Sequence, residues 1–324
     1  MMAAQPHTLG VMIEQYLQRQ RSLGRGYATE ERVLLSLHDF LSKAGAADLD
    51  QKIFQEWCKT HQKLTANVRR QRQRIVRNFC LYRQRTEPNC FVPDRSHFPH
   101  RCPHALPVIF GPVEVARMLA AAKTLTPTAG SPLRPAVMRL AVVMFYTAGL
   151  RRGELLRLTL ADIDLDEGVL RVHESKFHKS RLVPLSPDAH RELGTYLKKR
   201  LAPPFCRSPK SPLLCNCARG FRGYTGTGLS QGIQSLFRSA GVRSSDGRRP
   251  RVHDFRHSFA VQALLRWYRQ DADVQSNLPK LAMYMGHVSI VSTAYYLRWI
   301  PDLAEAASHR FARHFGHLIR EGAA

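Results

Sequence analysis

The sequence predicts a mainly α-helical protein with a small β-sheet, an α+β fold divided into two domains. Apolar residues recur at helical spacing over most of the 324 residues. One patch, between Ile163 and Leu185, reads instead as short strands. A stretch with five prolines, residues 87–107, interrupts the periodicity. The chain is long enough for two domains that each bury a core.

The first domain is expected over residues 1–90 as a small bundle of four helices. Its first helix places Leu9, Met12, Ile13, Tyr16 and Leu17 on one face. The second follows a possible cap at Thr29, the third follows Asp50, and the fourth begins at about Thr65. A linker over residues 91–110 then leads to the second domain.

The second domain is expected over residues 111–324. Pro112 is well placed in the first turn of a helix. Gly168 turns a hairpin, and the segments VLRVHE and RLVPL form strands. The polar stretch 202–223, with its prolines and cysteines, is interpreted as a surface insertion.

The charge of the chain indicates a polyanionic partner. Its 49 Lys and Arg face 25 Asp and Glu, which leaves a net charge of +24 and a pI near 10.4. Nucleic acid is the commonest polyanion, and a membrane surface is the alternative. The fourth helix carries the basic residues best placed for a phosphate backbone. These predicted DNA contacts are Arg69, Arg70, Arg72, Arg74 and Arg77.

Neither export nor membrane insertion is expected. The longest apolar run, around Leu140 to Leu150, is far too short to span a bilayer. The N-terminus does not read as a secretion signal. Seven scattered cysteines suit reduced thiols in a cytoplasm.

Five segments of the second domain contain the side chains that are candidates for catalysis. They are TAGLRRGELLRL (147–158), ESKFHKSRLVPL (174–185), HDFRHSFA (253–260), YMGH ending at His287, and Tyr296 nine residues later. In this order and spacing they resemble the tyrosine recombinase (phage integrase) family. The resemblance implies a helical core-binding domain followed by a mixed catalytic domain. It also implies a bacterial, cytoplasmic, nucleoid-associated enzyme of a mobile element.

The resemblance implies a role for each matched residue. Arg151 and Arg256 hold the non-bridging oxygens of a DNA phosphodiester, because a guanidinium binds two oxygens and keeps its proton. His287 adds a hydrogen bond. Tyr296 is the nucleophile, His253 takes its proton, and Lys176 protonates the leaving 5′-hydroxyl.

Three assignments have competitors in the sequence. Tyr295 stands beside Tyr296, and the step from His287 selects Tyr296. Lys179 and Arg181 compete with Lys176 for the acid role, and we expect both to contact DNA instead. Glu154, three residues after Arg151, is expected to orient that arginine.

No metal or other cofactor is expected, because the arginines supply the charge that a magnesium ion would provide. Two groups of cysteine and histidine leave a structural zinc as the alternative, although their spacing matches no common zinc motif. They are Cys90, His97, His100, Cys102 and His104 in the linker, and Cys215 with Cys217 in the insertion.

The family implies double-stranded DNA as the partner and a homotetramer on two DNA sites that exchanges strands through a 3′-phosphotyrosine and a Holliday junction. Companion recombinases or DNA-bending proteins remain open. The tail from Asp302 either docks on a neighbouring protomer or packs on its own domain. Two rivals remain, a type IB topoisomerase and a DNA-binding protein that does not cut.

Overall fold

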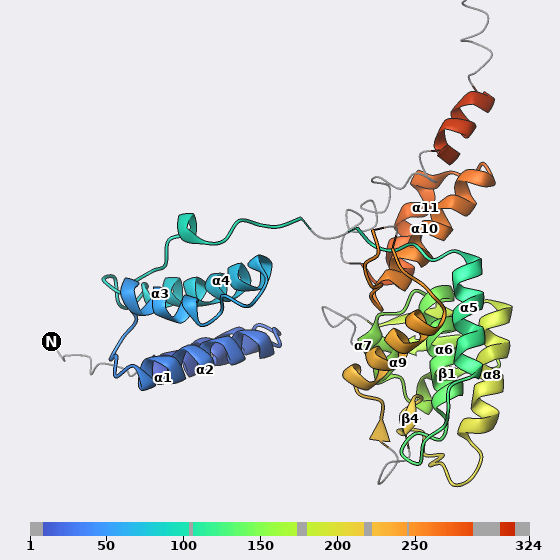
Figure 1. Ribbon diagram of the computed structural model, residues 1–324, viewed down its shortest axis with the longest axis horizontal. Coiled ribbons are helices and arrows are strands. Elements are labelled where there is room, and N and C mark those ends of the chain that lie inside the picture. The colour runs from blue at the N-terminus through green and yellow to red at the C-terminus, as the bar shows by residue number, and fades with distance from the viewer. Residues whose placement is uncertain are drawn as a thin grey trace, which may run out of the picture. The chain divides into compact units, whose positions relative to one another are not determined.

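The computed structural model describes residues 9–103, 106–173, 180–216, 222–244, 246–287 and 305–314 (Figure 1). The chain forms two compact units, residues 1–105 and 106–324. Helices dominate both units, and the strands are short and antiparallel. The predicted α+β class, mainly helical with a small sheet, is confirmed.

The described part of the first unit contains four α-helices and one 3₁₀ turn. They are α1 (Leu9–Ser22), α2 (Ala28–Lys43), α3 (Gln51–Lys59), α4 (Ala66–Arg83) and the turn η1 (Arg95–His97). The apolar faces of these helices enclose one core, in which Leu34, Leu37, Val76 and Phe79 are fully buried. The apolar spacing of the first helix is confirmed, since all five residues named for it are buried.

The helix starts were predicted with mixed success. The Asp50 carboxylate accepts a hydrogen bond from the Ile53 amide and caps α3, as expected. Thr65 is the residue that precedes α4. The cap expected at Thr29 is wrong, because α2 already begins at Ala28. Tyr27, with a φ of 46°, precedes it without a side-chain cap.

The segment after α4 folds back onto it. We call residues 91–102 the strap. Arg77 donates to the Pro93 carbonyl at 3.0 Å and Arg70 to the Pro99 carbonyl at 2.9 Å. The Asn67 amide exchanges two hydrogen bonds with the backbone of Cys102, at 2.9 and 3.0 Å. Much of the stretch expected as a linker therefore packs on the first unit.

The second unit surrounds a central helix, α6 (Arg134–Thr147), which is buried along most of its length (Figure 1). Around it lie α5 (Pro112–Lys123), α8 (Pro187–Arg200), α9 (Gly226–Ser239) and α10 (Asp254–Arg269). The unit also contains α7 (Arg152–Arg157), η2 (Leu160–Asp162) and α11 (Val274–Met285). Pro112 stands in the first turn of α5, as predicted.

The larger sheet in the described part of the second unit has three antiparallel strands in the order β1-β2-β3. Their bounds are β1 (Ile163–Asp164), β2 (Val169–Val172) and β3 (Arg181–Pro184). Gly168 has a φ of 64° in the turn before β2, which confirms the predicted hairpin. Val172 pairs with Arg181, so β3 begins with Arg181 opposite the end of β2.

The stretch 202–223 is more than a surface insertion. Leu213, Leu214 and Cys215 are buried, and the Leu213 amide donates to the Leu158 carbonyl at 2.8 Å. A short strand pair, β4 (Cys215–Asn216) with β5 (Arg222–Gly223), follows. Arg200, fully buried, donates to the Cys206 carbonyl at 2.7 Å and holds the loop. The apolar residues of the stretch 202–223 belong to the core, because the backbone hydrogen bond of Leu213 to Leu158 brings them inside.

Residues 305–314 are helical and contact their own chain. Arg310 donates to the Ala272 carbonyl at 2.9 Å, and its Nε lies 3.0 Å from the Asp271 carboxylate. His314 and Arg313 also lie against Asp271, at 3.2 and 3.4 Å. The rest of the tail from Asp302 lies outside the described residues.

Candidate active site

Arg151 stands where the chain leaves the buried helix α6. Gly149 has a φ of 59°, and a Cβ there would lie 2.5 Å from the ring of Phe259, so only glycine fits this reversal. Arg151 then precedes α7 with extended backbone. Its side chain is 23% exposed. The turn thus brings one guanidinium from the core to a position accessible to solvent.

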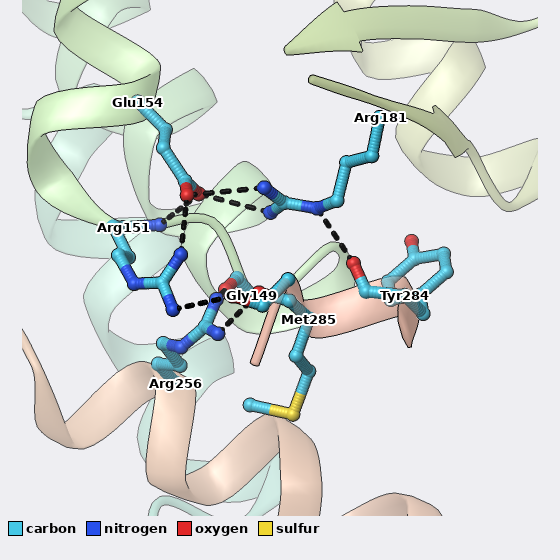
Figure 2. Close-up of polar contacts among 8 residues, drawn as sticks. Gly149, Arg151, Glu154, Arg181, Arg256, Tyr284 and Met285 are labelled. Carbon is cyan, nitrogen blue, oxygen red and sulfur yellow. Dashed lines mark hydrogen bonds and ion pairs between the residues drawn. The ribbon is translucent and has the colours of Figure 1, made fainter. Parts of the chain in front are cut away.

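Glu154 holds Arg151 from within α7. One carboxylate oxygen accepts from the Arg151 amide at 2.9 Å and the other from Nη1 at 2.7 Å (Figure 2). The Glu154 side chain is 1% exposed. Burial raises the pKa of Glu154, but hydrogen bonds from Arg181 and from the Arg151 backbone outweigh burial and lower it to about 2. Glu154 is therefore ionised at neutral pH and supports a fully charged pair.

Arg256 lies on the first turn of α10 and is 1% exposed. Its Nη1 donates to the Gly149 carbonyl at 2.6 Å, and its Nη2 donates to the Met285 carbonyl (Figure 2). Both acceptors are backbone atoms. The guanidinium is therefore fixed between the end of α6 and the end of α11.

The turn at the end of α11 also bonds to Arg151. Gly286 has a φ of 65° and ends the helix in the left-handed conformation, while the His287 amide donates to the Ala282 carbonyl at 2.8 Å. The Gly286 carbonyl accepts from Nη2 of Arg151 at 2.9 Å. His287 thus follows directly on a turn that is bonded to both Arg151 and Arg256.

The surroundings of His253 and His287 favour the neutral form of both imidazoles. Desolvation, and next the charge of Arg256, lower the pKa of His253. The same two causes, followed by Arg151, lower the pKa of His287 to about 4. The ring of His257 packs edge-on against His253 with centroids 4.9 Å apart. A neutral imidazole accepts a proton, so His253 suits a general base.

The phage integrase family matches residues 110–300 of this chain. A putative integrase/recombinase of Sinorhizobium fredii, y4rB, is 31% identical over 93% of the chain and 96% of its own length. A second from the same strain, y4rE, is 33% identical over 95% and 97%. The chain belongs to the phage integrase family, the tyrosine recombinases. The predicted family is confirmed, and with it the prediction of an enzyme that breaks and rejoins DNA.

A solved tyrosine recombinase structure agrees on the fold. The Tn1549 transposon integrase, in complex with transposon right end DNA, matches with a TM-score of 0.64 and 17% identity. The match covers 94% of this chain and all of the other (100%). At this identity the similarity shows a shared fold, and the match includes residues of both units of this chain.

The predicted residues of the recombinase site fall into two groups. The structure brings Arg151, Glu154, Arg256, His253 and His287 together around the ends of α6 and α11. The remaining positions lie outside the described residues: Lys176, Lys179, Tyr295 and Tyr296. Roles for both groups stay predictions.

Several arginines expected to contact DNA have partners inside the protein. Arg181 is bonded to Glu154 at 3.0 and 2.9 Å, and to the Tyr284 carbonyl at 2.7 Å. Arg70 and Arg77 hold the strap. Because these guanidiniums are drawn to protein acceptors, a contact with DNA competes with a structural bond at each.

Sequence reasoning missed the part that the α11 terminus takes in the site. The carbonyls of Tyr284, Met285 and Gly286 hold three arginines, and no side-chain pattern reveals a carbonyl acceptor. The available signal was Gly286 itself. A glycine directly after an apolar helix marks a left-handed end with exposed carbonyls.

Among the described residues, no three side chains of His, Cys, Asp and Glu lie close enough to hold a metal ion. Of the two groups considered for zinc, His104 and Cys217 lie outside those residues. In the same part of the chain, no helix is long and apolar enough to cross a membrane.

Proposed function

We propose that this recombinase cuts DNA at a specific site through a 3′-phosphotyrosine at Tyr296 and rejoins it to a new partner strand. The observation that carries the proposal is the anchoring of Arg151 and Arg256 on adjacent carbonyls, those of Gly286 and Met285. Donors fixed in this way pay no reorganisation cost when negative charge develops on a phosphate.

The chemistry follows from the charges of the site. Tyrosine has an ordinary pKa of about 10. Loss of its proton at neutral pH therefore needs a base and cationic surroundings, which His253 and the two arginines supply. The Tyr296 oxygen attacks the phosphorus as the bond to the 5′-oxygen breaks, and Lys176 gives that oxygen its proton. His287 donates to a non-bridging oxygen.

The phosphotyrosine bond preserves the energy of the broken phosphodiester. Attack by a 5′-hydroxyl of the partner strand then restores DNA and frees the tyrosine. Two such rounds, separated by a Holliday junction, exchange both strands. We assign this reaction to a homotetramer on two double-stranded sites, with companion recombinases or DNA-bending proteins as further partners.

The biological setting we propose is a bacterial mobile element that the recombinase integrates, excises or transposes. The names of the relatives, two putative integrase/recombinases, support this setting, as does the fold shared with a transposon integrase. In this setting the first unit acts as a DNA-binding domain. Arg69, Arg72 and Arg74 of α4 are its proposed phosphate contacts, together with Lys179 of the second unit.

A nicked suicide duplex taken from the ends of the element tests the nucleophile. Cleavage releases a short oligonucleotide that diffuses away, so the covalent protein–DNA adduct accumulates and is counted on a denaturing gel. Wild type and Tyr295→Phe should form the adduct, and Tyr296→Phe should form none. An adduct with Tyr296→Phe but none with Tyr295→Phe would move the nucleophile to Tyr295.

The same preparation separates the rival functions. Binding without any adduct would indicate a protein that marks a site without cutting. Relaxation of supercoiled plasmids that lack the element ends would indicate a topoisomerase. Site-specific adducts followed by strand exchange between two duplexes support the recombinase.

A further inference from the structure

Arg181 is largely covered by protein beside the site and does not project into solvent. Its side chain is 10% exposed although it begins strand β3. Nη1 and Nη2 donate to the two oxygens of Glu154 at 3.0 and 2.9 Å, and Nε donates to the Tyr284 carbonyl at 2.7 Å (Figure 2). A guanidinium suits this arrangement, because its planar fork matches a carboxylate while Nε points aside.

Glu154 transmits this contact to Arg151. Its two oxygens accept four hydrogen bonds, two from Arg181 and two from Arg151. Four is about the full capacity of an ionised carboxylate. The position of Glu154, and with it the Arg151 guanidinium, therefore depends on both arginines.

The second contact of Arg181 reaches the turn that precedes His287. The carbonyls of Tyr284, Met285 and Gly286 accept in succession from Arg181, Arg256 and Arg151. The final carbonyls of a helix lack intrahelical partners and carry the negative end of its dipole. A cation at each of them is therefore favoured. A Cβ at Gly286 would lie 2.9 Å from Nη1 of Arg181, so the turn fits closely over this side chain.

We propose that Arg181 is a positioning residue for DNA cleavage and not a DNA contact. It holds Glu154 and the last turn of α11 at one spacing, so that Arg151, Arg256 and His287 keep a single arrangement when a phosphate enters. The inference rests on the proposed function. It replaces the role that the sequence suggests for Arg181.

The first test separates binding from cleavage in Arg181→Lys and Arg181→Met. A positioning residue leaves the Kd for the suicide duplex, and its dependence on salt, within twofold of wild type. The cleavage rate at saturating DNA falls on the order of 100-fold in Arg181→Met, because Arg151 is then no longer held as a fixed transition-state donor. It falls less in Arg181→Lys, because lysine keeps the charge but loses the fork.

A DNA contact predicts the opposite result. Removing one phosphate contact weakens binding and lowers the slope of log Kd against log salt by about 0.9. Cleavage at saturating DNA then stays near wild type, which would overturn the inference. Arg191→Met is the matched control: Arg191 is 71% exposed on α8, where it pairs with Asp188, and its replacement should alter neither quantity.

The pH profile gives a readout that a general loss of structure does not change. Burial alone raises the pKa of Glu154, and Arg181 is the first of the groups that lower it to about 2. Without Arg181 this pKa rises, and a protonated Glu154 no longer holds the charged Arg151. The ratio of Arg181→Met to wild-type cleavage rates should therefore fall as pH decreases. A ratio that is flat with pH contradicts the inference.

A double-mutant cycle covers the case in which Arg181→Met folds poorly. Leaving a buried carboxylate half paired is strongly destabilising, and Glu154→Gln removes that charge. If Arg181 acts through Glu154, adding Arg181→Met to Glu154→Gln slows cleavage much less than it slows wild type. Equal, additive effects would overturn the inference. Failure of wild type itself to form the adduct would instead refute the proposed function.

Discussion

Helix α4 and the site around Arg151 both gather arginines, yet they use them differently. In α4 the arginines are close in sequence, and two of them, Arg70 and Arg77, donate to carbonyls of the strap. In the site, Arg151, Arg181 and Arg256 come from separate segments and all donate to carbonyls at one helix end. Arg151 and Arg181 also share the Glu154 carboxylate. Density of charge in the sequence therefore does not show which arginines are bonded inside the protein.

We expect the largest loss of cleavage activity from a substitution at Arg256. Arg256→Lys loses a bond to the Gly149 or the Met285 carbonyl, because an ammonium cannot span both. We expect single-turnover cleavage of the suicide duplex to fall roughly 100- to 1,000-fold. Arg77→Lys, the matched change in α4, should slow cleavage less than threefold. If the cleavage rate fell equally in both variants, the arginines of α4 and of the site would not differ in their importance for cleavage.

Gly286→Ala should have the next largest effect. The residue has a φ of 65°, and the new methyl would meet Arg181 at 2.9 Å. Gly24→Ala is a close control, because its φ is 75° and no atom lies within 4 Å of the added Cβ. Both should lose about 1 kcal/mol of stability from the backbone alone. Only Gly286→Ala should also slow cleavage, by about tenfold, and equal cleavage in both would exclude a packed α11 terminus.

Acid should weaken the second unit through its histidines. The pKa values of His257 and His287 are lowered from 6.5 to about 4, so between these values the unfolded chain binds more protons. Stability is therefore present above pH 6.5 and is lost as pH falls towards 4. The slope is at most about 1.4 kcal/mol per pH unit for each histidine.

Thermal unfolding followed from pH 7.5 to 4.5 measures this loss. Replacing His257 by Asn removes one titrating group, so the variant should show a shallower decline than wild type. A variant whose decline matches wild type would show that burial of His257 does not carry the effect.

The smallest effects are expected for Arg72 and Arg74 of α4. Arg72→Ala and Arg74→Ala should each weaken DNA binding modestly and lower the salt slope by about 0.9, as expected for a phosphate contact. Arg77→Ala should leave the slope unchanged, because Arg77 serves the strap. Filter binding at several salt concentrations measures both. A slope that falls equally in all three variants would return Arg77 to the DNA contacts.

Much of the fold was predictable because local patterns decide it. Three predicted features depend on only a few neighbouring residues and are confirmed. They are the helical spacing of the first helix, the cap at Asp50 and the hairpin at Gly168. The error at Thr29 has the same local scale, since a threonine can stand inside a helix as well as before it. The prediction of a surface insertion over residues 202–223 was wrong for another reason. The amide of Leu213 donates to the Leu158 carbonyl, and no periodicity in the sequence reveals that contact.

The site was predictable as a set of side chains but not as an arrangement. Motif order located Arg151, His253, Arg256 and His287, and the structure places them together. It could not assign Arg181, because a basic residue before a strand looks the same whether it faces a phosphate or a buried Glu154. That difference depends on packing between segments that are separate in sequence, since Arg181 lies 27 residues from Glu154 and 103 residues from Tyr284.

The helix end that holds Arg151, Arg181 and Arg256 has a consequence for how this enzyme can vary. Its acceptors are backbone carbonyls, so substitutions at Tyr284 or Met285 leave them in place. Covariation between these positions and the arginines should therefore be weak, although the contacts are close. A chimera that exchanges segment 274–287 alone should keep its acceptors, provided that the incoming helix ends on glycine at the same residue.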